Sequence, residues 1–247
     1  MLVSVITPCY NAGKYISQTI ESVISQTFKD WEMLIIDDCS TDDSEAIIKK
    51  YCLKDSRIKY FRTDSNSGSP ALPRNLGIEH AQGKYISFLD SDDIWFPRKL
   101  EEQLNFLIKK NYQIVYSDGN MIDMDGKSVK IMNKLSTVDY TTTLYRCELS
   151  CSSVLLTKSI IGSLRFEQTA KEDLVFWLKL LKERKITAHN TQHIHYCYRL
   201  LPNSRSRNKK SIVISQWYIY RKIEKLNVIL SLYYMNRYII SSFKKYF

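Results

Sequence analysis

The sequence lacks the short motifs that identify three common classes of enzyme. It contains no G-x-G-x-x-G pattern, no G-x-x-x-x-G-K-[ST] pattern and no G-x-S-x-G pattern. A dinucleotide-binding Rossmann enzyme, a P-loop phosphatase and a serine hydrolase with a nucleophile elbow are therefore unsupported. A phosphorylated ligand, if one is bound, must be held by side chains, backbone groups and metal.

Other absences bear on the compartment in which the protein works. The six cysteines form no C-x-x-C pair and no zinc-ligand spacing, and no N-x-[ST] glycosylation acceptor occurs. The amino-terminal run MLVSVITPCYN has no basic region and no small-residue cleavage site, so it is typical of a strand rather than a signal peptide. Charge-free runs near the carboxyl end, such as 226–236, are shorter than the ~20 residues of a spanning helix. We therefore expect a cytoplasmic protein with reduced thiols.

The positive charge is concentrated in the last fifth of the chain. The sequence has 36 Lys and Arg against 26 Asp and Glu, a net charge of +10. Residues 199–247 hold eleven of the basic residues and one acid, Glu224, whereas residues 1–198 carry 25 charges of each sign. A neutral body with a basic, aromatic-rich tail indicates that the tail meets an anionic partner, such as a membrane surface or nucleic acid.

Apolar, β-branched runs alternate with segments of helical periodicity through the first 110 residues. This pattern predicts strands over 2–7, 33–36, 58–61 and 84–89, and helices over 15–27, 40–50 and 71–81. The β-α-β order predicts an α/β fold whose mostly parallel sheet has helices on both faces. Later elements are expected to be a helix over 97–109, a strand over 113–117, a hairpin turning at Asp125-Gly126, a strand over 152–157, a helix over 173–181, a strand over 187–198 and a helix-prone tail over 212–247.

Polar clusters follow three of the predicted strands. They are Thr7-Pro8-Cys9-Tyr10-Asn11, Asp37-Asp38 and Asp90-Ser91-Asp92-Asp93. One such cluster alone is typical of a helix cap or a turn, but parallel strands bring their carboxyl ends, and with them the ligands, to one edge. Three carboxylates within four residues are costly unless a hard cation neutralises them. We expect a divalent metal here, bridging to a phosphorylated ligand. Tyr10 can stack on a base, Asp38 can accept from a base N–H, and Arg74 can face phosphate.

Four blocks of the sequence resemble the inverting glycosyltransferases of glycosyl transferase family 2. They are VSVITPCYN, SQTFKDWEMLIIDDCSTDDS, PRNLGIEHAQGKYISFLDSDDIWFPRKLEEQ and KEDLVFWLKLL. The resemblance implies a GT-A fold, in which a Rossmann-like nucleotide-binding half is fused to an acceptor-binding half. On this basis we expect a catalytic domain over residues 1–198, with halves 1–110 and 111–198, and a helical tail over 199–247.

The resemblance also implies roles for individual residues. Asp92 of the Asp90-Ser91-Asp92 (DxD) element would ligate Mn²⁺ or Mg²⁺, with Asp90 on the ribose side of the donor. Asp173 of the Glu172-Asp173 element would be the catalytic base. The remaining residues implied to bind the nucleotide sugar are Thr7, Pro8, Tyr10, Asn11, Asp38, Ser91 and Arg74, the last within Pro73-Arg74-Asn75 where the family has Ala-Arg-Asn.

These roles describe a single displacement. A metal held at Asp92 would act as a Lewis acid on the leaving UDP. Asp173, at the start of a helix whose dipole stabilises its charged form, would take the proton of the acceptor hydroxyl. One base without an enzyme nucleophile gives inversion, so an α-linked UDP-sugar yields a β-glycoside. Short members with basic, aromatic tails resemble bacterial O-antigen and capsule enzymes, which implies an undecaprenyl-diphosphate-linked or polysaccharide acceptor.

Two groups near the end of the predicted body have both a functional and a structural interpretation. His193 and His195 alternate on the last strand, where His195 is a candidate third metal ligand, although a hydrogen-bonded structural histidine is favoured. Arg199, Ser204 and Arg205 belong to a polar loop that either closes over the diphosphate or is simply solvated.

The residues beside the acidic motifs are similarly ambiguous. Asp93 and Trp95 follow the DxD element, and Trp95 either lines the site or packs in the core. Glu172 and Asp173 on their own would match the charge of a helix N-terminus. Trp177 is expected in the core, because leucines surround it at helical spacing.

Two other functions remain open at this point. A sugar-nucleotide-forming nucleotidyltransferase also uses strand-end carboxylates and metal, but it would open with a glycine-rich loop, and residues 7–15 contain one glycine, Gly13. Nucleic-acid binding would explain the tail but not the acidic strand ends, so we expect no nucleic acid.

The interleaved aromatics and cations of the tail fit helices lying on the inner face of an anionic cytoplasmic membrane. The alternative is that these aromatics pack on the body.

Overall fold

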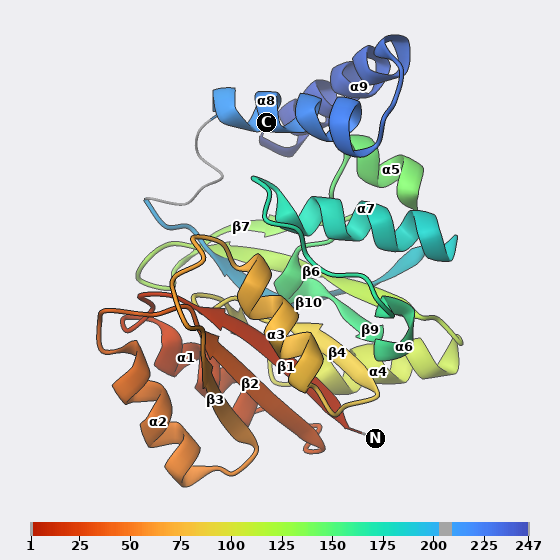
Figure 1. Cartoon of the computed structure of the whole chain (residues 1–247). Helices are drawn as coiled ribbons and strands as arrows, with labels where there is room; N and C mark the ends of the chain where they lie inside the picture. The colour runs from red at the N-terminus through yellow and green to blue at the C-terminus, as the bar shows by residue number, and fades with distance from the viewer. Residues whose placement is uncertain (1, 203–208, 247) are drawn as a thin grey trace.

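The computed structural model describes residues 2–202 and 209–246, which fold around one ten-stranded sheet (Figure 1). The strands follow the order β3-β2-β1-β4-β9-β6-β10-β5, with β7 paired to β6 and β8 paired to β10. Their bounds are β1 Val3–Cys9, β2 Trp31–Asp37, β3 Ile58–Arg62, β4 Tyr85–Phe88, β5 Ile94–Trp95, β6 Ile114–Ile122, β7 Ser128–Met132, β8 Thr137–Val138, β9 Leu155–Thr157 and β10 Ala188–Arg199. The sheet continues across residue 110, where we expected two halves to meet.

The first four strands of that order are parallel, as the β-α-β pattern predicted. β1 pairs in parallel with β2 and β4, and β2 pairs in parallel with β3. Every residue of β1 and β2 is buried, because helices cover both faces of a parallel sheet. The register places Cys9 opposite Asp37, so the polar residues that follow β1, β2 and β4 emerge at one edge.

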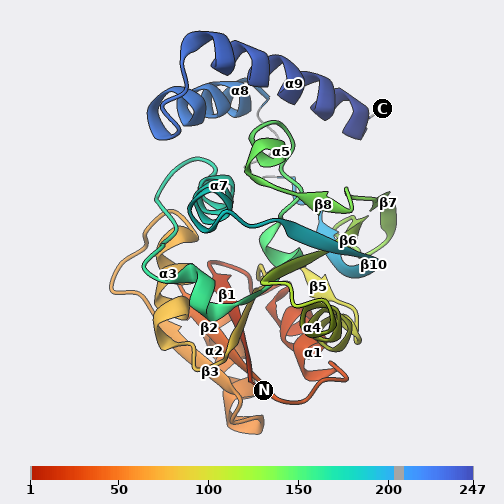
Figure 2. The same cartoon turned by 90° about the vertical axis from the view of Figure 1, so that its right-hand side faces the viewer.

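Helices form a layer on each face of the sheet (Figures 1 and 2). Alternate residues of β1 point to opposite faces, so Val5 packs with α1, α2 and α4, whereas Ile6 packs with α3, α6 and α7. The bounds of these helices are α1 Ile16–Ile24, α2 Ser44–Lys54, α3 Ala71–His80, α4 Lys99–Lys109, α6 Lys158–Ile161 and α7 Glu172–Arg184. The expected α/β fold, with helices on both faces of the sheet, is thereby confirmed.

Helix α3 lies unusually close to the sheet, and a glycine permits this approach. A Cβ atom built on Gly77 would come within 2.3 Å of the Ile6 side chain and 3.1 Å of Ile36. Any larger residue would therefore push α3 away from β1 and β2. Because Arg74 lies one turn earlier on α3, this close packing also sets the position of its guanidinium.

Several elements depart from the predicted boundaries. The two-residue strand β5 was not predicted, although it pairs with β10 and holds the far end of the acidic segment 90–93. The strand predicted over 152–157 begins as a 3₁₀ turn, Cys151–Ser153, and becomes extended only at β9. The hairpin turn at Asp125-Gly126 is confirmed between β6 and β7, where Gly126 has φ +86°.

The carboxyl-terminal tail packs on the body rather than extending from it. It comprises α8 Lys209–Tyr218, a π-helical turn Ile219–Ile223 and α9 Val228–Tyr246. Ile219, Tyr220 and Met235 form a third buried cluster with α7 and with α5 Tyr140–Tyr145. The tail lies above α7 in both views (Figures 1 and 2). In the described ranges 2–202 and 209–246, no helix has the length and apolar character needed to cross a membrane.

Candidate active site

The ends of β1, β2 and β4 form the floor of the candidate site. The backbone N–H of Asp38 donates to the carbonyl of Cys9 at 2.8 Å, which ties the end of β2 to that of β1. The N–H of Leu89 donates to the carbonyl of Ile6 and continues the pairing of β4 beyond its last residue. The three polar clusters singled out in the sequence therefore meet at one edge, as predicted.

The acidic segment 90–93 is a tight turn whose carbonyl groups are held from outside. The N–H of Asp93 donates to the carbonyl of Asp90 at 3.1 Å. The hydroxyl of Thr19 on α1 donates to the carbonyls of Ser91 and Asp93, at 2.9 and 2.8 Å. The Arg199 guanidinium donates through Nε to the carbonyl of Asp92 at 3.0 Å. Donors from two distant segments thus fix the backbone, so the direction of the carboxylates does not depend on the turn alone.

Crowding of the carboxylates raises the pKa values of Asp92 and Asp93, in line with the cost that the sequence indicated. Burial and the charge of Asp90 raise the pKa of Asp92 to about 6. The pKa of Asp93 is raised still more strongly, by burial and by the carboxylates of Asp92 and Asp90. Asp93 is 1% exposed and accepts from the Ser152 hydroxyl at 2.6 Å and from the Arg199 N–H at 3.1 Å. Asp93 is therefore a structural anchor of the turn, and Asp92, half-buried, is the carboxylate that remains for a ligand.

The carboxylates of the acidic turn are suited to binding a hard divalent cation. Such ions prefer carboxylate oxygens, and a cation at Asp92 would offset the repulsion that raises its pKa. Asp90 lies within the same turn and is one-third exposed. Asp92 and, beside it, Asp90 are accordingly the residues that would hold Mn²⁺ or Mg²⁺.

Arg74 has different partners from those predicted. We expected it to face phosphate, but its side chain is 4% exposed, with Nη2 2.7 Å from Asp90 Oδ1 and Nη1 3.1 Å from Glu172 Oε1. The guanidinium also lies over the ring of Phe166, 5.3 Å from its centroid. A buried cation between two carboxylates satisfies both, and its own pKa is raised by them. Arg74 therefore joins the DxD turn to the start of α7.

Asp173 begins α7 next to Glu172, as predicted. Its Oδ1 accepts from the N–H of Leu174 at 2.7 Å, which is a contact with the positive end of the helix. Burial and the neighbouring Glu172 nevertheless raise its pKa. Preceding it, Lys171 donates to Gln216 Oε1 at 2.7 Å and to the Tyr238 hydroxyl at 3.2 Å, both in the tail. The tail thus supports the helix end that carries Asp173.

Three of the residues expected to bind the nucleotide sugar, Tyr10, Asp38 and Asn11, lie in different environments. Tyr10 is 52% exposed, so its ring is open to stacking. Asp38 is 3% exposed, and its carboxylate accepts from the hydroxyls of Thr63 and Ser67 and from the Ser67 N–H, so it organises the segment after β3. Asn11 Oδ1 accepts from the Thr41 N–H at 2.8 Å and links the two strand-end loops.

Two further residues of the first predicted cluster lie within the sheet. Thr7 is fully buried, and its hydroxyl has no hydrogen-bond partner among the residues that the structure describes. Pro8 is also buried, opposite Ile36. Neither side chain is exposed at the surface in this conformation.

Two ambiguous residues, Trp95 and Arg199, occupy structural positions. Trp95 is 2% exposed and donates through Nε1 to the carbonyl of Ser152, so it packs in the core and does not line the site. Arg199 is also 2% exposed and ends β10, so it belongs neither to a solvated loop nor to a closing one. Ser204 and Arg205 lie outside the described residues. Trp177 is fully buried, as predicted.

His195 does not accompany Asp92. Its Nε2 lies 2.8 Å from Glu102 Oε2, and its backbone carbonyl accepts from Phe96. The group of close metal-type ligands that includes it comprises Glu102 and His193, and Asp92 is not a member. The structure therefore groups His195 with Glu102 and His193, and the third-ligand position at Asp92 stays a prediction.

Sequence reasoning missed the residues that support the acidic turn. Ser152 accepts from the Asp90 N–H at 3.1 Å and donates to Asp93, yet nothing in its neighbourhood marks it as part of the site. Thr19 on α1 carried no signal either, since its role lies in a contact 72 residues away along the chain. Such partners are visible only after the chain has folded.

Comparison with known proteins agrees with this geometry. The model of glycosyl transferase family 2 matches residues 4–150. The Escherichia coli protein named UDP-Glc:alpha-D-GlcNAc-diphosphoundecaprenol beta-1,3-glucosyltransferase WfgD is 35% identical over 245 residues, which are 99% of this chain and 95% of WfgD. The structure of S. aureus TarS 1–349 in complex with UDP-GlcNAc superposes with a TM-score of 0.76 at 23% identity, over 99% of this chain and 73% of that chain.

A second solved structure with this fold carries a metal ion. The mannosyltransferase PcManGT from Pyrobaculum calidifontis, in complex with GDP-Man and Mn²⁺, superposes with a TM-score of 0.68 at 14% identity, over 91% of this chain and 64% of that chain. At these identities the two structures show only the fold, which is the GT-A fold expected from the sequence. The family model and the E. coli relative show the family and the class of enzyme. The resemblance seen in the sequence is therefore confirmed: the chain belongs to glycosyl transferase family 2 and is a glycosyltransferase.

Proposed function

We propose that the enzyme transfers a hexose from a UDP-sugar to a hydroxyl of an undecaprenyl-diphosphate-linked saccharide, with inversion, during synthesis of a surface polysaccharide. The observation that carries the proposal is the Arg74 bridge, which holds the DxD turn and the Glu172-Asp173 helix end together. The name of WfgD specifies a UDP-glucose donor and a diphosphoundecaprenol acceptor, and its full-length similarity supports the same substrate classes here.

The residues at this junction can divide the reaction between them. Asp92, with Asp90 beside it, would hold a divalent cation, which supplies positive charge to the diphosphate of the leaving UDP. Asp173 would accept the proton of the attacking hydroxyl on the opposite side of the sugar. Because Glu172 and burial raise the pKa of Asp173, it is a stronger base than an ordinary aspartate once ionised. With one base and no enzyme nucleophile, an α-linked donor gives a β-glycoside.

The test is transfer from a panel of UDP-hexoses and their N-acetyl forms to a lipid-diphosphate-linked GlcNAc acceptor in the presence of Mn²⁺. We expect one donor to give a β-linked product, read from the proton NMR coupling of the anomeric centre, and chelation to abolish the reaction. The matched control is Asp173→Asn, which keeps the shape of the site. Transfer to form an α-linked product would contradict the single-base scheme, and undiminished transfer with a chelator would contradict the metal.

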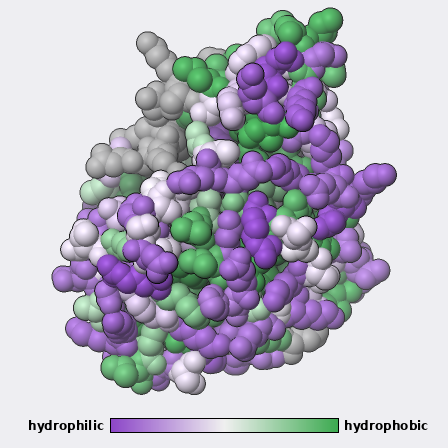
Figure 3. All heavy atoms as spheres, in the orientation of Figure 1, coloured by the Kyte–Doolittle hydropathy of each residue, from purple (hydrophilic) through white to green (hydrophobic). Residues whose placement is uncertain are grey.

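We further propose that the tail lies against the inner face of the cytoplasmic membrane, where such an acceptor would be found. Exposed apolar residues lie along α9, and Lys222 and Lys225, which precede this helix in the chain, are also exposed. Figure 3 shows apolar side chains over the tail next to hydrophilic ones. The apolar residues are Val228, Ile229, Leu230, Leu232, Tyr233, Ile239 and Ile240. Apolar contact and attraction of cations to anionic lipid, about 1 kcal/mol for each cation, act together at such a surface.

The tail proposal is tested with vesicles rather than by truncation, because the tail also supports α7. The full chain should sediment with phosphatidylglycerol vesicles at low salt and much less with phosphatidylcholine vesicles. The variant Ile229→Ser/Leu232→Ser should lose most of this binding, whereas Leu53→Ser, at an 89% exposed position on α2, should keep it. Equal binding by all three proteins would show that α9 does not contact the membrane.

A further inference from the structure

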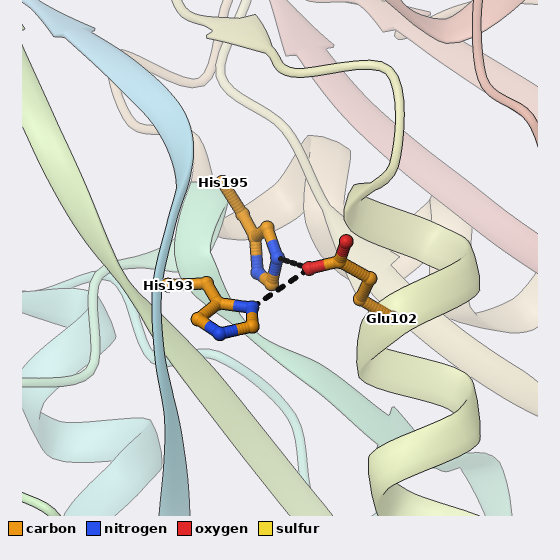
Figure 4. A group of neighbouring side chains, drawn as sticks. All are labelled: Glu102, His193 and His195. Atoms are coloured by element: carbon orange, nitrogen blue, oxygen red, sulfur yellow. Dashed lines mark hydrogen bonds and ion pairs between the residues drawn. The ribbon is translucent and has the colours of Figure 1, made fainter.

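Two histidines and a glutamate meet on one carboxylate oxygen, away from the acidic turn. His193 Nδ1 and His195 Nε2 each lie 2.8 Å from Glu102 Oε2 (Figure 4). One potential ligand atom from each of the three residues lies within 4.8 Å of the others. We name these residues the His-Glu cluster.

Two elements supply the cluster, and their geometry aims the three side chains at one point. His193 and His195 are two residues apart on β10 and extend toward α4, which carries Glu102 (Figure 4). The pairing of β10 with β6 is irregular between Asn190 and Tyr196, and Gln192 has φ +58°. Such irregularities redirect side chains relative to a regular strand and are common beside functional sites. Here the irregularity lies within the stretch that presents both imidazoles.

The chemistry of the three groups matches a borderline transition metal. Imidazole and carboxylate together suit Zn²⁺, and two histidines with one glutamate leave a fourth tetrahedral position for water. Tetrahedral ligand atoms about 2.0–2.1 Å from zinc lie about 3.3 Å from one another. The N–O separations must therefore widen by about half an ångström from 2.8 Å, which a small rotation of the Glu102 side chain, 23% exposed, provides.

A metal ion can bind the ring nitrogens that face Glu102 if the proton of each imidazole moves to its other ring nitrogen. In the hydrogen-bonded form, the ring N–H groups donate to Glu102. When a metal ion replaces the protons on His193 Nδ1 and His195 Nε2, each imidazole adopts the other tautomer. The Thr191 hydroxyl lies 3.4 Å from His195 Nδ1 and can then accept its proton, as the outer partners of metal-bound histidines do. His193 is 66% exposed and can donate its other N–H to water.

The charges around the cluster permit a cation. His195 is 2% exposed, and burial disfavours the charged form of its ring. Arg98 Nε lies 3.2 Å from Glu102 Oε1, but its side chain is 68% exposed and free to turn toward solvent. Lys99 is fully buried next to His195, and burial lowers its pKa well below the usual value, which weakens its repulsion of a cation.

We propose that Glu102, His193 and His195 form a binding site for Zn²⁺ or a closely similar transition-metal ion, distinct from the Mn²⁺ or Mg²⁺ position at Asp92. The ion would link α4 to β10, the strand whose last residue, Arg199, holds the carbonyl of Asp92. Zinc at the cluster would therefore stabilise the strand that supports the acidic turn, and it would do so without contacting the donor.

The test is titration of the full chain, stripped of metal with a chelator, with Zn²⁺ alone and then with Mn²⁺ alone, by calorimetry. We expect one zinc ion per chain, an increase in Tm with zinc, and two imidazoles in its X-ray absorption spectrum. His193→Ala changes an exposed side chain, so the fold should be retained, and it should weaken zinc binding by at least about tenfold and abolish the shift in Tm. Manganese binding should be unchanged by this substitution.

Two further variants separate the cluster from other sites. His80→Ala removes a histidine that stacks on Phe61, outside the cluster, and should bind zinc like the wild type. Asp92→Asn should bind zinc like the wild type while losing manganese. Absence of saturable zinc binding, or equal zinc affinity in His193→Ala and wild type, would show that the cluster is held by hydrogen bonds alone. Loss of zinc in Asp92→Asn would also overturn the proposal, because the ion would then belong to the acidic turn.

Discussion

Arg74 Nη1 lies 3.1 Å from Glu172 Oε1, although 98 residues separate the two along the chain. The other terminal nitrogen of the same guanidinium lies 2.7 Å from Asp90. One buried cation therefore connects the carboxyl edge of the parallel strands to the N-terminus of α7. This contact brings the acidic turn and the proposed base into one site.

Replacing Arg74 should destabilise the protein severely. Arg74→Met leaves Glu172 buried without its cation, and breaking a buried pair from one side costs about 3–5 kcal/mol. The free energy of unfolding in urea measures this loss. The matched control is Lys49→Met, which breaks the exposed pair with Glu45 and should change stability far less, because water screens pairs at the surface. Equal effects in the two variants would mean that the Arg74 bridge contributes little to stability.

Removal of the proposed base should separate binding from chemistry. Asp173→Asn keeps the side-chain volume and leaves the acidic turn untouched, so UDP affinity should be unchanged. The rate of transfer should fall by about 10²–10⁴, the range typical of loss of a general base. Calorimetry and product formation measure the two quantities. If transfer stays within a few-fold of the wild type, another group takes the proton.

Metal-dependent donor binding should depend on Asp92. Asp92→Ala removes the half-buried carboxylate of the turn, so the diphosphate would face Asp90 and Asp93 without a well-held cation. Calorimetry with UDP and Mn²⁺ should show loss of the metal-dependent component. Asp125→Ala, at the exposed tip of the hairpin, is the control and should bind as the wild type does. Unchanged affinity in a folded Asp92→Ala protein would contradict the DxD assignment.

The pH dependence of transfer should respond to Glu172. A base acts in its ionised form, so kcat/KM rises as the pH passes through the pKa of Asp173, which burial and Glu172 raise. Glu172→Gln removes a negative charge next to Asp173 and leaves the positive charge of Arg74 without that partner. Both changes favour the ionised form of Asp173 and therefore lower its pKa. The acidic limb of the kcat/KM profile should therefore move to lower pH. A limb that stays in place would show that Asp173 does not control it.

The tail should matter for stability where it is buried and not where it is exposed. Met235 is 9% exposed in the cluster beneath α9, and Met235→Ala should cost about 2 kcal/mol or more. Ile229 on the same helix is 79% exposed, and Ile229→Ala should change stability by less than about 0.5 kcal/mol. Urea unfolding compares the two. Equal costs would indicate that α9 does not pack on α7 in solution.

Local patterns were sufficient to predict the parallel half of the fold and the edge that carries the site. β1 and β2 are buried on both faces, so each appears in the sequence as a continuous apolar run. The polar residues that stop these runs are adjacent in sequence to the strands, and parallel pairing alone brings them to one edge. Asp92 was singled out for the same reason, because it follows β4, whereas Asp173 was singled out through the family resemblance.

The partners of the charged residues, by contrast, were decided by tertiary packing. Arg74 meets Glu172, Arg199 meets the Asp92 carbonyl 107 residues away, and His195 meets Glu102 instead of the acidic turn. Trp95 and the tail aromatics Tyr220 and Tyr238 are likewise placed by what lies opposite them. A side chain's own neighbours in sequence determine its secondary structure and approximate burial. Its hydrogen-bond partner depends on which distant element packs against it, because the free energy of a buried charge is set by the opposite charge that reaches it after folding.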